Sequence, residues 1–252
     1  MIFEPKMQET IKIVINAYTQ FHPVNSSMNV RIIFEDDVSE FVKKYTNVNI
    51  LMPCNGTVVF ENIENEIIVV ISNTVFELDE WTWIGTIHHE MTHANDMYEY
   101  CTNNFLRTMD EMFNCLSYTP FVMWSEYHAR KNGYYAIRKL LCNSISKEDR
   151  KKNADEVLLQ MREDMKKRYT GNIYSLENVN DIMQHLGRLA VFAEEYPEKI
   201  DNFFQSVFEN ILNTEHFEKV KNMFEVCYKC KEIEQAMEYI NEIDDCLIEL
   251  MK

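Results

Sequence analysis

Glycine and proline are scarce in this chain, with five of each among 252 residues. This scarcity excludes collagen-like and low-complexity chains, which are rich in both, and it favours long helices over a β-sandwich. Basic residues are also few, with 25 Lys and Arg against 41 Asp and Glu and a formal net charge of -16. Because such a surface repels phosphate backbones, we expect no direct nucleic-acid partner.

Long apolar runs are missing as well. Nowhere do about 18 apolar residues follow one another, and no basic segment followed by an apolar run opens the sequence. We therefore expect a cytoplasmic protein that does not associate with a membrane, while its oligomeric state stays open. The seven cysteines are an odd, scattered set without a compact disulfide framework. Cys227 and Cys230 form one CxxC pattern, but no second pair completes a tetrahedral zinc site.

The first third of the chain carries the strand signals. Apolar spacing predicts a helix over residues 5–20 and a short helix over 39–45, and period-two alternation predicts a strand near residues 30–35. Two β-branched runs, at 57–60 and 66–71, suit a hairpin. The second run is apolar on both faces and predicts a central strand, whereas the first, or the segment around Pro53, belongs nearer the sheet edge.

From Asp79 onward the sequence is helical. Asp79 can cap a helix that runs to about Tyr98. Further helices are expected at residues 104–117, 121–142, 147–168, 176–195, 198–212, 215–230 and 232–250. We predict an α+β protein in which residues 1–143 form a small mixed β-sheet with active-site helices. Residues 144–252 then form a helical region that completes or covers the cleft.

Residues 89–93 read His-Glu-Met-Thr-His, the HExxH pattern. On a helix, His89 and His93 lie one turn apart on nearly the same face, so both imidazoles can bind one zinc ion. Glu90 lies beside them, where its carboxylate can take a proton from the water that the metal activates and pass it to the leaving amine. His88 gives no competing pattern, because another histidine follows it.

A catalytic zinc site needs a third protein ligand and an open position. The sequence Trp-Ser-Glu-Tyr-His-Ala-Arg at residues 124–130 resembles the ExxA segment on the second active-site helix of gluzincins. The resemblance implies that Glu126 is the third ligand and that Ala129 is the small residue that lets two helices approach. Glu111 is the alternative, because its distance from His93 is nearer the thermolysin-like spacing, but no matching alanine follows it.

The chain thus resembles gluzincin-type HExxH zinc metallopeptidases over about residues 28–142, and more distantly the ImmA/IrrE-type peptidases. Metzincins match less well, because Asp96 stands where they have a glycine and Glu99 would therefore point along the helix. The resemblance implies a compact zincin-like domain that hydrolyses peptide bonds with Zn²⁺. It also implies that the strand at 57–60 pairs with an extended peptide or protein substrate.

Several roles and two other functions stay open. Asp96 could accept a hydrogen bond from a ligand histidine or be a solvated residue. His128 lies two residues from Glu126 and therefore faces away from a metal there, which favours a packed aromatic. His185 and Tyr135 are candidate donors to a developing oxyanion. The alternatives to a peptidase are a non-catalytic helical regulatory protein on the same scaffold and a zinc hydrolase of a non-peptide substrate.

Overall fold

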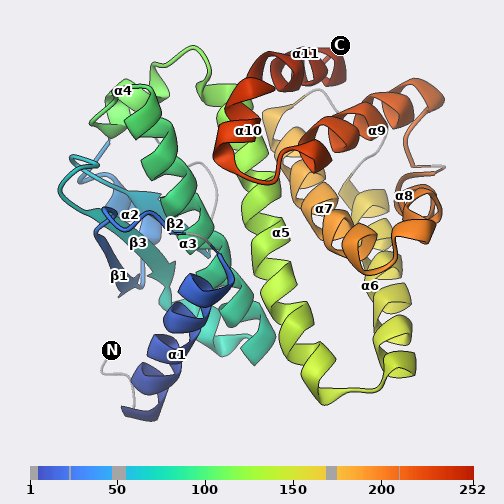
Figure 1. The fold of residues 1–252 in the computed structure, drawn as a ribbon, viewed down its shortest axis with the longest axis horizontal. Helices are drawn as coiled ribbons and strands as arrows, with labels where there is room; N and C mark the ends of the chain where they lie inside the picture. The colour runs from blue at the N-terminus through green and yellow to red at the C-terminus, as the bar shows by residue number, and fades with distance from the viewer. Residues whose placement is uncertain (1–4, 23, 47–54, 169–174, 210) are drawn as a thin grey trace. The chain divides into compact units, whose positions relative to one another are not determined.

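The computed structural model describes residues 5–22, 24–46, 55–168, 175–209 and 211–252. The chain is a mixed α+β protein, as the sequence predicts, and it divides into two compact units, residues 1–115 and 116–252 (Figure 1). In the described part of the chain, no helix has both the length and the apolar character that crossing a membrane requires.

The sheet of the first unit has three strands, β1 (Val30–Glu35), β2 (Gly56–Val59) and β3 (Ile67–Ser72), in the order β1-β3-β2. β3 pairs in parallel with β1 and antiparallel with β2, and all of its residues are buried. The predicted hairpin and the central position of the all-apolar strand are therefore confirmed. β2 is an edge strand, whereas the segment around Pro53 lies outside the described residues.

Four helices and a 3-10 turn complete the described part of the first unit. They are α1 (Pro5–Phe21), α2 (Val38–Val42), η1 (Asn73–Glu77), α3 (Glu80–Asn103) and α4 (Met109–Phe113). α3 packs against β2 and β3, and α1 packs against α3. Asp79 caps α3 as predicted, since its carboxylate accepts hydrogen bonds from the backbone N–H groups of Trp81 and Thr82, both at 3.0 Å.

The helix predicted over residues 104–117 is wrong in extent, because α4 covers only five residues. Phe105 has a φ of 56°, a left-handed conformation that an α-helix does not contain. Thr108 and Glu111 then form a capping box that starts α4 several residues later. Local backbone geometry thus delays the start of the second helix, which the sequence predicts from residue 104, until Met109.

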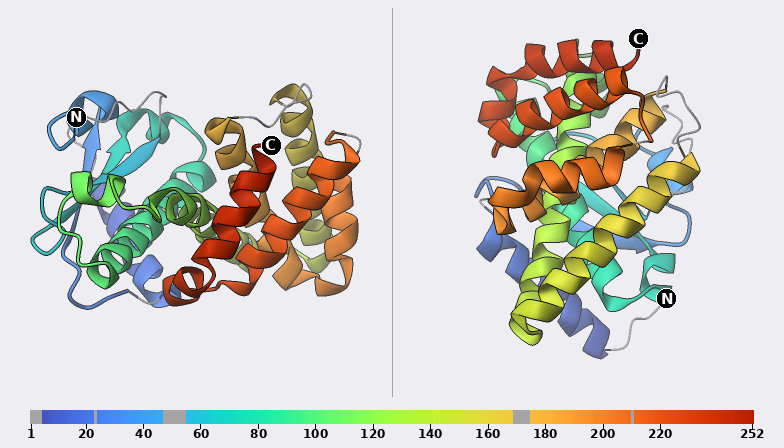
Figure 2. Two further views of the ribbon diagram at one scale, coloured as in Figure 1. Left: turned by 90° about the horizontal axis from the view of Figure 1, so that it is seen from above. Right: turned by 90° about the vertical axis from the view of Figure 1, so that its right-hand side faces the viewer.

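The second unit is helical throughout its described residues. It contains α5 (Tyr118–Ser144), α6 (Lys147–Arg168), α7 (Leu176–Glu195), η2 (Pro197–Lys199), α8 (Ile200–Phe208), α9 (Thr214–Lys229), α10 (Ile233–Glu238) and α11 (Ile240–Leu250). α5 packs along α7, and α9 lies beside α11 (Figure 2). The single helix predicted over 232–250 is interrupted at Tyr239. The sequence places a domain boundary after residue 143, near the end of α5. In the structure α5 packs on α7 and belongs to the second unit, which begins at residue 116.

A buried arginine links three helices of this unit. Arg138 on α5 is 1% exposed, and its guanidinium donates to both carboxylate oxygens of Glu195 on α7, at 3.0 and 2.5 Å. It also donates to Oδ1 of Asn153 on α6 at 2.7 Å, and it lies over the ring of Phe192. A buried charge is tolerated when a bidentate partner and further hydrogen bonds satisfy it, as here.

Candidate metal site

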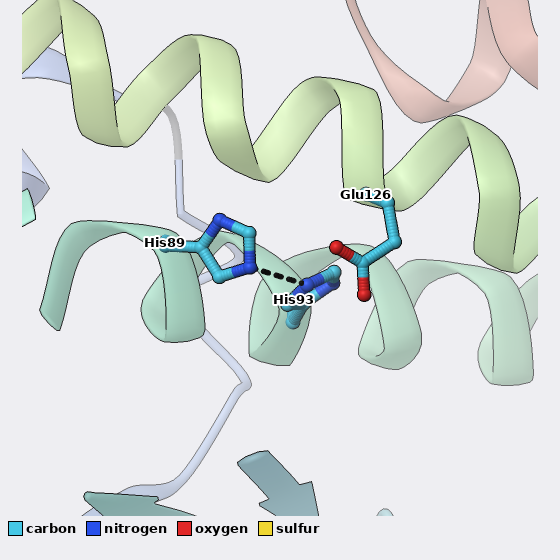
Figure 3. A group of neighbouring side chains, drawn as sticks. All are labelled: His89, His93 and Glu126. Carbon is cyan, nitrogen blue, oxygen red and sulfur yellow. Dashed lines mark hydrogen bonds between the residues drawn. The ribbon is translucent and has the colours of Figure 1, made fainter. Parts of the chain in front are cut away.

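His89 and His93 come together on α3. Both side chains are buried, their Nε2 atoms lie 3.0 Å apart, and their rings are nearly perpendicular, at 86° (Figure 3). Zinc binds nitrogen at about 2.0–2.1 Å in tetrahedral geometry, which places two ligand nitrogens roughly 3.3 Å apart. The two Nε2 atoms form a hydrogen bond with each other, and their separation is close to the one that two nitrogen ligands of a single ion have.

Glu90 is buried beside this pair and packs on the edge strand. A Cβ atom placed on Gly56 of β2 would lie 2.6 Å from Cγ and 2.9 Å from Cδ of Glu90. Any side chain at position 56 would therefore displace the carboxylate. We did not identify Gly56 from the sequence, although a glycine at the start of a β-branched run is a known sign of a close backbone approach.

His88 lies in a different environment from its neighbour. Its ring is 1% exposed and contacts the rings of Tyr18 and His22 on the N-terminal side of the chain, with centroids 5.4 and 6.0 Å away. Burial lowers the pKa of His88 to about 4, so its ring is neutral at pH 7. These contacts make His88 a packing residue between α1 and α3.

Glu126 lies on α5 of the second unit and is half-buried. Its Oε2 atom accepts a hydrogen bond of 3.2 Å from Nε2 of Gln184 on α7. Among the described residues, His89, His93 and Glu126 are a group whose candidate ligand atoms all lie within 4.8 Å of one another (Figure 3). These are the three ligands that the sequence predicts, and two imidazoles with one carboxylate suit zinc.

Glu111, the alternative ligand, has a local role instead. Its Oε2 atom accepts hydrogen bonds from the backbone N–H groups of Arg107 at 2.7 Å and Thr108 at 3.0 Å. These two bonds lower the pKa of the Glu111 carboxyl. Glu111 therefore serves the N-terminus of α4, which explains its place in the sequence without a metal.

Asp96 and Glu99, the two other acidic candidates, both lie on α3. Asp96 is fully buried on α3, which contradicts the solvated alternative. Glu99 accepts a hydrogen bond of 2.7 Å from Nδ2 of Asn25, and α3 continues past it to Asn103. The absence of a turn after His93 agrees with the expectation that the metzincin arrangement does not apply.

The aromatic candidates have different environments. His128 is buried, stacks on Trp124 with centroids 4.7 Å apart, and lies 3.1 Å from Nδ2 of Asn132. This agrees with the predicted packing role. Tyr135 lies nine residues after Glu126 on the continuous helix α5, which corresponds to about 13 Å of rise and half a turn of rotation. It therefore lies on the opposite side of α5 from Glu126.

His185 is poorly suited to donate to an oxyanion. Its Nδ1 atom lies 2.7 Å from the carbonyl oxygen of Asp181, which can only accept, so Nδ1 carries the proton. Burial lowers the pKa of His185 to about 4, and at neutral pH Nε2 is therefore an unprotonated acceptor. Neither of the two candidates from the sequence, Tyr135 and His185, is therefore identified as the donor to an oxyanion.

The CxxC pattern has no metal-site geometry. Cys227 and Cys230 are both buried, and the Cys230 thiol contacts the carbonyl oxygen of Val226 at 3.3 Å. Burial raises the pKa of the Cys230 thiol to about 11 and raises the pKa of the Cys227 thiol well above its usual value. Neither thiol readily forms the thiolate that binds metal or reacts, so packing explains this pair.

Comparison with known proteins gives no relative: no family model, no curated protein and no solved structure matches this chain. Function must therefore be inferred from the side chains themselves. The strongest chemical feature is the buried His89–His93 pair, with Glu90 one residue away and Gly56 leaving room for its carboxylate.

Proposed function

We propose that this protein is a zinc-dependent peptidase of the gluzincin type, with His89, His93 and Glu126 as metal ligands and Glu90 as general base. The main support for the proposal is the distance of 3.0 Å between the Nε2 atoms of His89 and His93. These are the two histidines that the HExxH spacing predicts to bind one ion. Glu126 is the third ligand in this proposal because residues 124–130 resemble the gluzincin ExxA segment, and its carboxylate belongs to the same group of possible ligand atoms. A site with three protein ligands leaves a position for water, as catalytic zinc requires.

Zinc in such a site acidifies water and polarises a carbonyl group. Glu90 accepts the proton of the attacking water and delivers it to the departing amine nitrogen. Its buried position against Gly56 limits the directions in which the carboxylate can move. His89 and His93 lie one helical turn apart, and this spacing keeps their Nε2 atoms close enough for both to bind one ion.

Two features of the first unit favour a peptide substrate. Glu90 packs on β2, which is the edge strand of the sheet. Among the described residues, β2 pairs with β3 alone, so its outer edge can form main-chain hydrogen bonds with an extended chain. A peptide added there lies beside the base that would act on it.

Zinc stoichiometry tests the metal site. We expect one ion per chain, by elemental analysis, in the wild type and in Glu111→Gln, and loss of the ion in Glu126→Gln. The two variants remove the same charge from two helices, so they separate a ligand from a capping residue. A wild type that takes up no zinc after reconstitution would exclude the proposal and favour a helical regulatory protein.

A peptide-library digest tests the reaction. We expect cleavage by the zinc-loaded wild type and none above background by Glu90→Gln, which keeps both histidines. Zinc binding with no cleavage of any peptide, combined with hydrolysis of small esters or amides, would instead support the non-peptide hydrolase.

A further inference from the structure

Gln184 on α7 bridges two side chains of α5. Its Nε2 atom donates to Oε2 of Glu126 at 3.2 Å, and its Oε1 atom accepts a hydrogen bond from Nη2 of Arg130. Asn180, one turn earlier on α7, adds a longer contact of 3.4 Å to the same Nε2 atom. Gln184 and Glu126 are both half-buried, so this chain of bonds is partly shielded from water.

The orientation of the Gln184 amide follows from its partners. A guanidinium group only donates, so the amide atom that faces Arg130 must be the oxygen. The NH₂ group then faces Glu126, whose carboxylate accepts. Arg130 thus fixes the direction of the amide, so that its NH₂ group donates to the Glu126 carboxylate.

Close packing of the two helices holds this arrangement. A Cβ atom at Gly187, three residues after Gln184, would overlap the carbonyl oxygen of Tyr127, the residue that follows Glu126. Only glycine lets the backbone of α7 come this near α5 at that point. The amide of Gln184 therefore reaches Glu126 from a rigid neighbouring helix.

We infer that Gln184 is a positioning residue for the metal ligand Glu126, an inference that rests on the proposed function. Its N–H···O bond holds the Glu126 carboxylate through Oε2. Partners of this kind orient a ligand before the metal arrives, and their loss typically weakens metal affinity by about 10–100-fold. Nothing in the spacing of the sequence connects residue 184 to residue 126, because the contact depends on α5 packing along α7.

The test is the zinc dissociation constant of the full chain, measured by competition with a chromophoric chelator. Gln184→Met keeps the length of the side chain and removes the amide, and we expect roughly 10–100-fold weaker binding. Gln184→Asn is the second variant, because its shorter amide stays polar and cannot span to Glu126. Gln160→Met on α6 is the matched control: Gln160 makes an equivalent bond of 2.9 Å to Asp164 on an exposed helix face, and its loss should leave affinity unchanged.

A second readout separates positioning from packing. The visible spectrum of the Co²⁺-loaded protein reports ligand geometry, and we expect it to change in both Gln184 variants and not in Gln160→Met. A fall in the melting temperature of the metal-free Gln184 variants, with zinc affinity and cobalt spectrum unchanged, would overturn the inference. If wild type binds zinc and Glu126→Gln loses it while both Gln184 variants bind normally, only the positioning role fails. If wild type binds no zinc, the proposed function fails and takes this inference with it.

Discussion

The chain contains two short patterns built from metal-binding residue types, HExxH on α3 and CxxC at the end of α9, and they have opposite environments. In the first, two buried imidazoles come together, with a hydrogen bond of 3.0 Å between their Nε2 atoms. In the second, buried thiols contact the sulfur of Met223 or backbone carbonyl oxygens. A motif carries chemistry only when its side chains converge and can take the charge state that the chemistry needs.

Spacing alone does not distinguish the two patterns, because each places a pair of ligands within about one helical turn. Surroundings do. Gly56 on β2 leaves room for the Glu90 carboxylate beside the two histidines, whereas the thiols are buried and burial raises the pKa of Cys230 to about 11. The predictions below test this difference, from the largest expected effect to the smallest.

Removing one imidazole should abolish metal binding. We expect His93→Ala to contain no zinc, because the remaining ligands give at most two protein contacts to the ion. Cys230→Ser, the matched change in the other pattern, should keep one ion per chain. Elemental analysis measures the zinc content of both proteins, and circular dichroism verifies that both are folded. Loss of zinc in Cys230→Ser would reverse the comparison.

Glu90→Gln should keep zinc and lose activity. The amide occupies the same space and cannot accept the proton of water, so we expect kcat to fall by about 10²–10⁴-fold. Steady-state cleavage of a peptide selected from the library screen measures it. A variant that keeps full activity would show that Glu90 is not the base.

The two thiols should label slowly in the native protein. With a pKa of about 11, Cys230 is a thiolate roughly 100-fold less often at pH 8 than an unperturbed cysteine. The thiolate fraction grows as pH rises toward the pKa, so labelling should accelerate about tenfold per pH unit up to about pH 11. Mass spectrometry after iodoacetamide treatment measures each site, with the half-buried Cys115 as reference. Rapid labelling of Cys230 at pH 7 would instead indicate a reactive thiol.

Gly56→Ala should impair the reaction and spare the metal. The added methyl group would lie 2.6 Å from Cγ of Glu90, so the carboxylate must shift. Moving a catalytic group by about 1 Å lowers kcat by about 10–100-fold. Thr57→Ser on the same strand is the control and should stay near wild type. Equal activity of Gly56→Ala and wild type would mean that the position of Glu90 is not set by β2.

Much of the first unit follows from local sequence signals. The five-residue HExxH spacing places two histidines and a glutamate on one helix, the run Ile67–Ser72 identifies the central strand, and Asp79 marks the start of α3. Each signal depends on residues within one or two turns or along a single strand. Such short-range patterns are reliable because they determine both the secondary structure and the face on which each side chain lies.

The missed features depend on tertiary packing or on backbone geometry. Gly56 matters only because α3 lies on β2, and Gln184 only because α7 lies along α5. Phe105 has a positive φ that its residue type does not predict, and the helix expected from residue 104 therefore begins only at Met109. The sequence nevertheless favours Glu126 over Glu111 as a ligand, since an alanine follows three residues later only after Glu126, and the structure shows that Glu111 caps α4 with Thr108.

Arg138 has a consequence for how the second unit comes apart. If α7 left α5, the guanidinium would lose Glu195 while its surroundings remained largely apolar, a state that costs about 3–5 kcal/mol. Partial opening at that end is therefore penalised, and α5, α6 and α7 should unfold as one cooperative block with similar amide-exchange rates. The same coupling fixes the register of the helices that carry Glu126 and Gln184, so their alignment is maintained as long as that block is folded.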